Sequence, residues 1–131
     1  MTYAKNTSVP VERTKAEIEK LVKKYGAKGF AVGWHGDRAQ LSFIAHDRHI
    51  RFTIIVPQQA QAQRSRWRTL LLLVKAKLEA VDAKVVTFEE AFFADIIIPE
   101  TGKTVWETAR EPLKLAYEGK SVNLLEPPRA H

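Results

Sequence analysis

Apolar residues in the first part of the chain recur at the spacing of one helix face. They fall at i, i+3, i+4 and i+7, at Ile18, Leu21, Val22 and Tyr25, which is typical of an amphipathic helix. Thr14 and Glu17 fit a capping box, in which each side chain hydrogen-bonds the backbone amide of the other residue. Gly26 stands where a left-handed residue would end the helix. The pattern predicts a helix over residues 15–25.

In the next stretch the spacing changes to two. Residues 30–35, 40–45 and 50–56 alternate apolar with polar or small side chains, and turn-forming residues separate these runs. The alternation predicts a three-stranded antiparallel meander with one apolar face. The phenylalanines of the meander all fall on that face, at Phe30, Phe43 and Phe52. The other face is polar to mildly basic, and Trp34 lies at a strand end.

Helical spacing returns in the second half of the chain. A long helix is predicted over residues 61–82, and Thr87 and Thr104 each begin a further capping box and a further helix. Between these two helices, residues 96–98 form a short apolar strand that a turn follows. Pro112 is expected to kink or split the last helix, because its ring removes a backbone hydrogen bond.

This order of elements, α-β-β-β-α-α-(β)-α, predicts an α+β fold. The apolar face of the meander must be covered, most simply by the first two long helices, which gives a two-layer sandwich with a C-terminal helical cap. We expect an extended arm over residues 1–13, a single domain over residues 14–119 and an extended tail over residues 120–131.

The long helix carries two apolar surfaces. The stripe expected to lie on the sheet contains Trp67, Leu70, Leu71, Val74, Leu78 and Val81. The opposite side holds small or apolar residues, namely Ala62, Ser65, Thr69, Leu72, Leu73, Ala76 and Ala80. A helix side that faces solvent would carry charges instead, so either the C-terminal helices or a second subunit should cover it. The candidate interface residues are Leu72, Leu73, Ala76 and Trp106.

Cations flank the core stripe of this helix. Their long stems suit the edge of a core, with the charged heads in water. The alternative is a phosphate or carboxylate site, because guanidinium groups bind such anions bidentately. Arginines near a helix start also oppose the helix dipole, and a bound anion would relieve that conflict. The candidate anion-binding residues are Arg51, Arg64, Arg66, Arg68, Lys75 and Lys77.

Composition narrows the class of protein. The chain has 131 residues, a formal charge of +6 and a pI of about 9.7, which indicates one domain that attracts phosphate. It has no cysteine, which excludes a disulfide scaffold and thiolate chemistry. No secretory signal is visible, and the longest apolar run, residues 70–74, is far shorter than the ~20 residues of a membrane span. We expect a cytoplasmic protein without a membrane partner.

Other chemistries have little support in the sequence. His35 is expected at the first turn of the meander, with His46 and His49 at the second, whereas a structural metal needs about four ligands together. No nucleophile–base pair can be assembled, and Gly-Lys-Thr at residues 102–104 lacks the earlier glycine of a phosphate-binding loop. The outward sheet face lacks aromatic side chains for stacking RNA bases. We expect no catalytic residues, no cofactor and no metal.

Several segments resemble one family of small proteins. These are "KAEIEKLVKKYGA", "GDRAQLSFIAHDRHIRF", "RWRTLLLLVKAKLEAV", "TFEEAFFADIIIPETGKTVWE" and "AYEGK". They are similar to a family encoded in phages and prophages that has no established activity. The longer arginine-rich insert of that family is here the short "QQAQAQ". The resemblance implies no catalytic residues. It implies an accessory protein in a bacterial host, either a nucleic-acid handling factor or an inhibitor of a host system.

Two functions remain open at this point. The first is a non-enzymatic, anion-recognising module for nucleic acid or a nucleotide ligand. The second is a protein-binding inhibitor of a host defence system that acts as a homo-oligomer, with a dimer favoured. The first predicts affinity that falls steeply with salt, because phosphate contacts release counterions. The second predicts a complex that salt does not dissociate.

Overall fold

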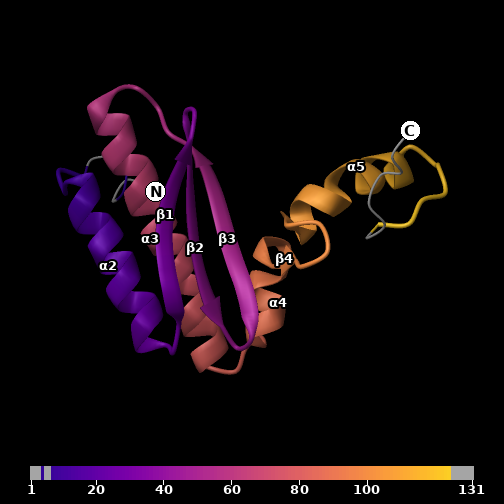
Figure 1. Cartoon of the computed structure of the whole chain (residues 1–131), viewed down its shortest axis with the longest axis horizontal. Coiled ribbons are helices and arrows are strands. Elements are labelled where there is room, and N and C mark those ends of the chain that lie inside the picture. Colours follow the sequence, from indigo (N-terminus) through magenta and orange to yellow (C-terminus); the bar gives the residue numbers. More distant parts are fainter. Residues whose placement is uncertain (1–3, 5–6, 125–131) are drawn as a thin grey trace.

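A computed structural model describes residue 4 and residues 7–124 (Figure 1). It has the α+β architecture that the sequence predicts. The helices are α2 (Val11–Lys24), α3 (Ala60–Asp82), α4 (Phe88–Phe92), the 3-10 helix η1 (Phe93–Asp95) and α5 (Val105–Tyr117). The strands are β1 (Lys28–His35), β2 (Arg38–Ala45), β3 (Arg48–Ile55), β4 (Ile97–Ile98) and β5 (Lys103–Thr104). No described helix combines the length and the apolarity that a membrane span requires.

The main sheet is the predicted meander, with strand order β1-β2-β3 and both pairs antiparallel. Helices α2 and α3 lie side by side and form the second layer (Figure 1). His46 and Asp47 connect β2 to β3 with φ angles of 50° and 60°, as a two-residue type I′ turn requires. The Val56 amide donates to the Asp37 carbonyl at 2.8 Å and extends the β2–β3 ladder.

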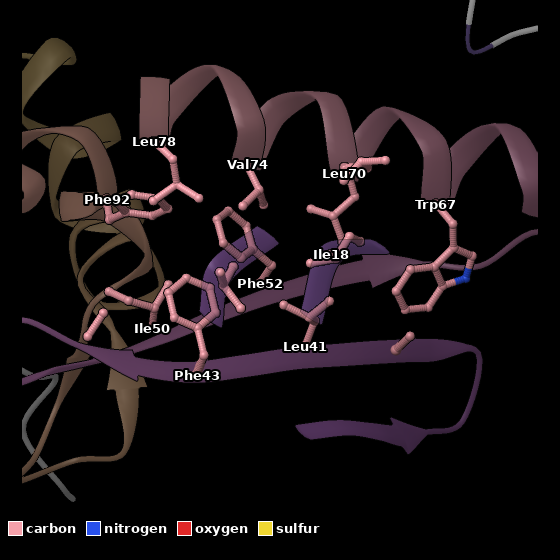
Figure 2. Close-up of a cluster of buried hydrophobic side chains, with 14 of the residues drawn as sticks. Ile18, Leu41, Phe43, Ile50, Phe52, Trp67, Leu70, Val74, Leu78 and Phe92 are labelled. Carbon is pink, nitrogen blue, oxygen red and sulfur yellow. The ribbon is translucent and has the colours of Figure 1, made fainter. Parts of the chain in front are cut away.

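The core lies between the two layers. Figure 2 shows the side chains of α3 pointing at those of the sheet, with Ile18 of α2 beside them. The predicted stripe of the long helix is its buried face, apart from Val81, which is partly buried. Phe43 and Phe52 are buried and Phe30 is partly buried against them. The prediction that these aromatic side chains face the core is therefore confirmed.

The start of α2 differs from the prediction. The helix begins at Val11, behind Pro10, and the Thr14 amide donates to the Pro10 carbonyl at 3.2 Å. Thr14 is fully buried on the same helix face as Ile18, so its hydroxyl does not cap the helix. The predicted capping box at Thr14 is wrong because this position belongs to the core. Residues 11–13 accordingly belong to the helix and not to an extended arm.

The predicted terminal segments are described only in part. Residues 7–10 and 120–123 have no regular secondary structure. The rest of the predicted arm and tail lies mostly outside the described residues. Within the arm, Ala4 is helical and is buried to 3% exposure.

Residues 87–119 form a C-terminal unit that projects from the β3 side of the sandwich (Figure 1). Its two predicted capping boxes are confirmed at Thr87 with Glu90 and at Thr104 with Glu107. Strands β4 and β5 pair as a small hairpin, in which the predicted short strand is β4. The unit begins inside the core, because the Phe92 ring packs edge-on against Phe43 at a centroid distance of 6.1 Å.

Pro112 does not split α5, contrary to one of the two expected outcomes. The helix continues through it from Val105 to Tyr117. A proline removes one amide from the hydrogen-bond ladder, but both ends of this helix are capped by hydrogen bonds. The capping box closes the start, and the Gly119 and Lys120 amides donate at 3.0 Å to carbonyls of the last turn in a Schellman arrangement.

Candidate anion-binding surfaces

The structure places the six predicted anion-binding residues on separate surfaces. Arg68 and Lys75 line a groove between α2 and α3. Arg66 and Lys77 lie on the other flank of α3, where each donates to a backbone carbonyl, of Ile55 at 2.8 Å and of Ala91 at 2.5 Å. Arg64 donates to the Gln61 side chain at 2.5 Å. Arg51 lies on the sheet face that points away from α3. The six residues therefore do not form one site.

The groove between α2 and α3 gathers more positive charge than the other surfaces. It holds about 320 Å³ and is lined by Glu17, Lys20, Leu21, Lys24, Arg68, Leu71, Leu72 and Lys75. The cations come from both helices, and leucines separate them. Within the described part of the chain, Lys20, Lys24 and Lys75 form no ion pair. Four cations therefore face one carboxylate in this groove.

Arg68 and Glu17 join the two walls of the groove. An Arg68 Nη1 hydrogen donates to Glu17 Oε2 at 2.9 Å, and the Arg68 side chain is largely buried. A partly buried, charge-assisted bond of this kind also fixes the spacing of the helices. The interaction neutralises Glu17, so that the remaining lysines give the groove its electrostatic character.

The side of α3 that faces away from the sheet is largely open. Leu73 is 45% exposed, and Thr69 and Ala76 are exposed. A shallow depression of about 550 Å³ lies there, lined by Ala4, Thr69, Leu72, Leu73, Lys75, Ala76 and Glu79. The C-terminal helices do not cover it, because α5 packs on η1 and β5 and projects away from α3 (Figure 1). Of the two predicted covers, the intrachain one is therefore wrong.

Trp106 does not belong to the same surface as the other predicted interface residues. It stands at the start of α5 and lines a cleft together with Arg51, on the opposite side of the sheet from Leu73. The predicted interface of Leu72, Leu73, Ala76 and Trp106 is thus two separate surfaces. Trp106 is 53% exposed.

The cleft at Trp106 lies between the outward face of the sheet and α5. Its volume is about 410 Å³, and its lining is Arg38, Arg51, Phe52, Thr53, Ala94, Asp95, Thr104, Trp106, Glu107 and Arg110. Arg51 crosses it and donates to Glu107 Oε1 at 2.6 Å. The same oxygen accepts from the Thr104 amide at 2.7 Å. Glu107 therefore caps α5 and ties the helix to β3.

Two carboxyl groups of the cleft have pKa values that differ from their ordinary values. Burial raises the pKa of Asp95 from 3.8 to about 6, although the Lys77 ammonium nearby lowers it. Burial also raises the pKa of Glu107, but hydrogen bonds from the Thr104 amide and from Arg51 outweigh it and hold that pKa below its ordinary value. Near neutral pH the cleft thus contains a fully ionised Glu107 and an Asp95 that titrates within the physiological range.

The histidines lie where the sequence predicts, at opposite ends of β2. His35 pairs with Arg38 beside the first turn, and His46 and His49 flank the second. The His46 ring stacks on Phe88 with a centroid distance of 4.4 Å. Among the described residues, no group of three or more histidine or acidic side chains could hold a metal ion.

Sequence reasoning missed the residues that complete both basic surfaces. Lys20 and Lys24 are spaced i, i+4 on the polar side of α2, which alone indicates only a solvated face. Arg38 and Arg110 lie far apart in the sequence and line the same cleft only because the bond between Arg51 and Glu107 holds the start of α5 at the sheet. The sole signal was the excess of basic residues, which does not specify positions.

Comparisons with protein-family models, with curated proteins and with solved structures find no match to this chain.

Proposed function

We propose that this chain is a non-enzymatic binding module that recognises nucleic acid through the groove between α2 and α3. The observation that supports it is the line of cations on both walls of the groove, at Lys20, Lys24, Arg68 and Lys75. Lysine ammonium groups on flexible stems suit phosphates whose spacing varies along a backbone. The overall charge of +6 would add long-range attraction.

The groove favours a polymer over a small ligand. It is shallow and open, and its lysines stand one helix turn apart on α2, so they follow an extended path along the helix axis. The leucine floor contains no polar group that would read a base. We therefore expect binding that depends on phosphate charge and little on nucleotide sequence.

The test is a titration of a short fluorescently labelled DNA, single-stranded and duplex, followed by anisotropy. The variant Lys20→Gln/Lys24→Gln/Lys75→Gln should lose about tenfold or more in affinity, and its salt dependence should become shallower by about two to three units of log–log slope. The matched control is Lys84→Gln/Lys103→Gln/Lys114→Gln, which removes equal charge from exposed positions outside the groove.

Two outcomes would reject the proposal. One is a wild-type protein that does not bind either DNA at about 50 mM salt, where phosphate contacts are strongest. The other is an equal loss of affinity in the groove variant and in the matched control, which would mean that only net charge matters.

A second candidate function rests on the exposed side of α3. Leu73 and Ala76 lie in an open depression that nothing in the described chain covers beyond Ala4. An apolar helix side of this kind is typical of subunit contacts. We propose as the alternative a homo-oligomer that binds a host protein, in line with the phage-type context that the resemblance implies.

Light scattering separates this alternative from the first. Leu73→Glu should convert an oligomer to a monomer, whereas Leu113→Glu, at an exposed leucine of α5, should leave the mass unchanged. If the wild-type protein is a monomer at every concentration, the depression is not a contact between copies.

A further inference from the structure

The cleft between the sheet and α5 is held open by the fold itself. Its floor is the outward face of β2 and β3, and its wall is the first turns of α5. The bond between Arg51 and Glu107 and the capping box at Thr104 fix that wall to the floor. The volume of about 410 Å³ lies within the usual range of small-molecule sites, roughly 300–1,000 Å³. The cleft is therefore preformed and of finite size.

Two arginines of the cleft are free to bind a ligand. Arg38 extends from β2 and Arg110 from α5, and both are exposed. Neither makes a hydrogen bond or an ion pair with any described residue, in contrast to Arg51. Guanidinium groups from two walls of one cleft suit a phosphate, which offers several oxygens to bidentate donors.

Trp106 supplies a planar apolar surface next to these charges. Slightly more than half of its side chain is exposed although it stands at the start of a helix. Exposed tryptophan rings in basic clefts bind the faces of nucleobases, because every base has a π-face that stacks on indole. The cleft thus combines a stacking surface with phosphate-binding groups.

Asp95 adds an acceptor to the same cleft. It comes from η1, is only partly exposed, and accepts no hydrogen bond from any described residue. A partly buried carboxylate without a donor is costly, and a ligand with N–H groups would satisfy it. The edges of nucleobases carry such donors. The raised pKa of Asp95 has the same cause, since burial without a hydrogen bond disfavours its charge.

We propose that this cleft binds a mononucleotide, with its base stacked on Trp106 and its phosphate held between Arg38 and Arg110. A free nucleotide fits better than a polymer because the cleft is bounded by Thr104 and α5 on one side and by Ala94 and Asp95 of η1 on another. The site shares no lining residue with the groove between α2 and α3, so the inference does not depend on the proposed nucleic-acid function.

The test is isothermal titration calorimetry of the full chain with GMP, AMP and UMP, beside inorganic phosphate and guanosine. At least one nucleotide should bind at least tenfold more tightly than phosphate or nucleoside alone. Trp106→Ala should weaken that binding about tenfold, as expected for the loss of one stacked base. Trp106→Phe should restore most of it, which excludes misfolding as the cause.

The charge contribution is tested by Arg38→Gln/Arg110→Gln, which should also weaken nucleotide binding about tenfold or more and leave guanosine binding unchanged. The matched controls are Trp34→Ala, at a tryptophan that is 56% exposed outside the cleft, and Arg13→Gln on α2. Both controls should bind as wild type. The proposal is overturned if no nucleotide binds at millimolar concentration, if phosphate binds as tightly as the nucleotides, or if the controls lose as much affinity as the cleft variants.

Discussion

The helix–sheet sandwich and the C-terminal unit are built by different forces. In the sandwich, α3 and the sheet bury large side chains completely, such as Trp67 and Phe43. In the C-terminal unit, the large buried side chains are Phe88 and Phe92 of α4, and from η1 onward burial is limited to smaller positions such as Val105 and Thr108. The apolar residues Phe93, Trp106 and Tyr117 are 48%, 53% and 88% exposed. Polar contacts hold this unit instead, namely two capping boxes and the ion pairs from Arg48 and Arg51.

The two regions therefore have different roles, since one stabilises the fold and the other carries the proposed nucleotide-binding cleft. The sandwich supplies the hydrophobic free energy that folds the domain, because that energy follows the apolar area removed from water. The C-terminal unit contributes little of it and leaves its apolar side chains accessible beside arginines. A binding cleft requires aromatic side chains that stay exposed, and the polar contacts of the C-terminal unit hold its aromatic side chains in such positions. A buried core cannot offer them.

The largest expected effect comes from a matched pair of phenylalanines. Phe43→Ala removes a fully buried ring of the sandwich and should lower the free energy of unfolding by about 3–5 kcal/mol. Phe93→Ala removes a half-exposed ring of the C-terminal unit and should cost less than about 1 kcal/mol. Urea unfolding followed by circular dichroism measures both. Equal losses would show that the C-terminal unit carries as much of the core as the sandwich.

The two capping boxes give the next largest effect. Glu107→Gln removes the charge that binds Arg51 while an amide can still accept from Thr104, and it should destabilise the protein by about 1–2 kcal/mol. Glu90→Gln alters an exposed cap that lacks an arginine partner and should destabilise the protein less than Glu107→Gln. The difference in unfolding temperature between the two variants measures how much the bond between Arg51 and Glu107 stabilises the attachment of α5 to the sheet. No difference would mean that the Arg51–Glu107 bond is not needed.

Asp95 should make the stability of the cleft region depend on pH. Below pH 4 both the folded and the unfolded chain carry the proton. Because the pKa rises from 3.8 to about 6 on folding, the unfolded chain ionises first, and stability falls between about pH 4 and pH 6. Asp95→Asn should therefore stabilise the protein by about 1 kcal/mol at pH 8, a value reduced for solvent screening, and hardly at all at pH 4.

The charged groups around Asp95 come from several elements. Lys77 of α3 acts on Asp95 electrostatically, and the other charged groups of the cleft are Arg38 and Arg51 of the sheet and Glu107 and Arg110 of α5. The control is Glu111→Gln at an exposed carboxyl of α5, which should not reproduce the pH dependence. Thermal melts across this pH range would contradict the prediction if Asp95→Asn shifts the unfolding temperature equally at both ends.

The smallest expected effect is a gain in stability, and it comes from a residue at the junction between the sandwich and the C-terminal unit. Lys84 follows α3 with a φ of 62°, and its amide and that of Val85 donate to carbonyls of the last helix turn. Glycine adopts this left-handed conformation without steric cost. Lys84→Gly should raise the free energy of unfolding by about 0.5 kcal/mol, whereas Lys84→Ala should not. A loss of stability in the glycine variant would contradict this account.

Local patterns predicted the elements well where only neighbouring residues decide them. The strand alternation and the capping boxes at Thr87 and Thr104 depend on contacts within a few residues, and all of them are present. The prediction failed at Thr14, whose sequence also fits a capping box. There the burial of the threonine on the core face of α2 and the proline at residue 10 outweigh the local signal, and only tertiary packing reveals this.

The sequence by itself determined the α+β class, the buried stripe of α3 and the excess of positive charge, because periodicity and composition are local properties of the chain. Only the tertiary structure decided where the charges meet. Lys20 and Arg68 line one groove because α2 and α3 pack side by side, and Arg38 and Arg110 line one cleft because Glu107 ties the start of α5 to Arg51 of the sheet. A binding surface depends on distances between residues remote in sequence, and those distances are set by how the core packs.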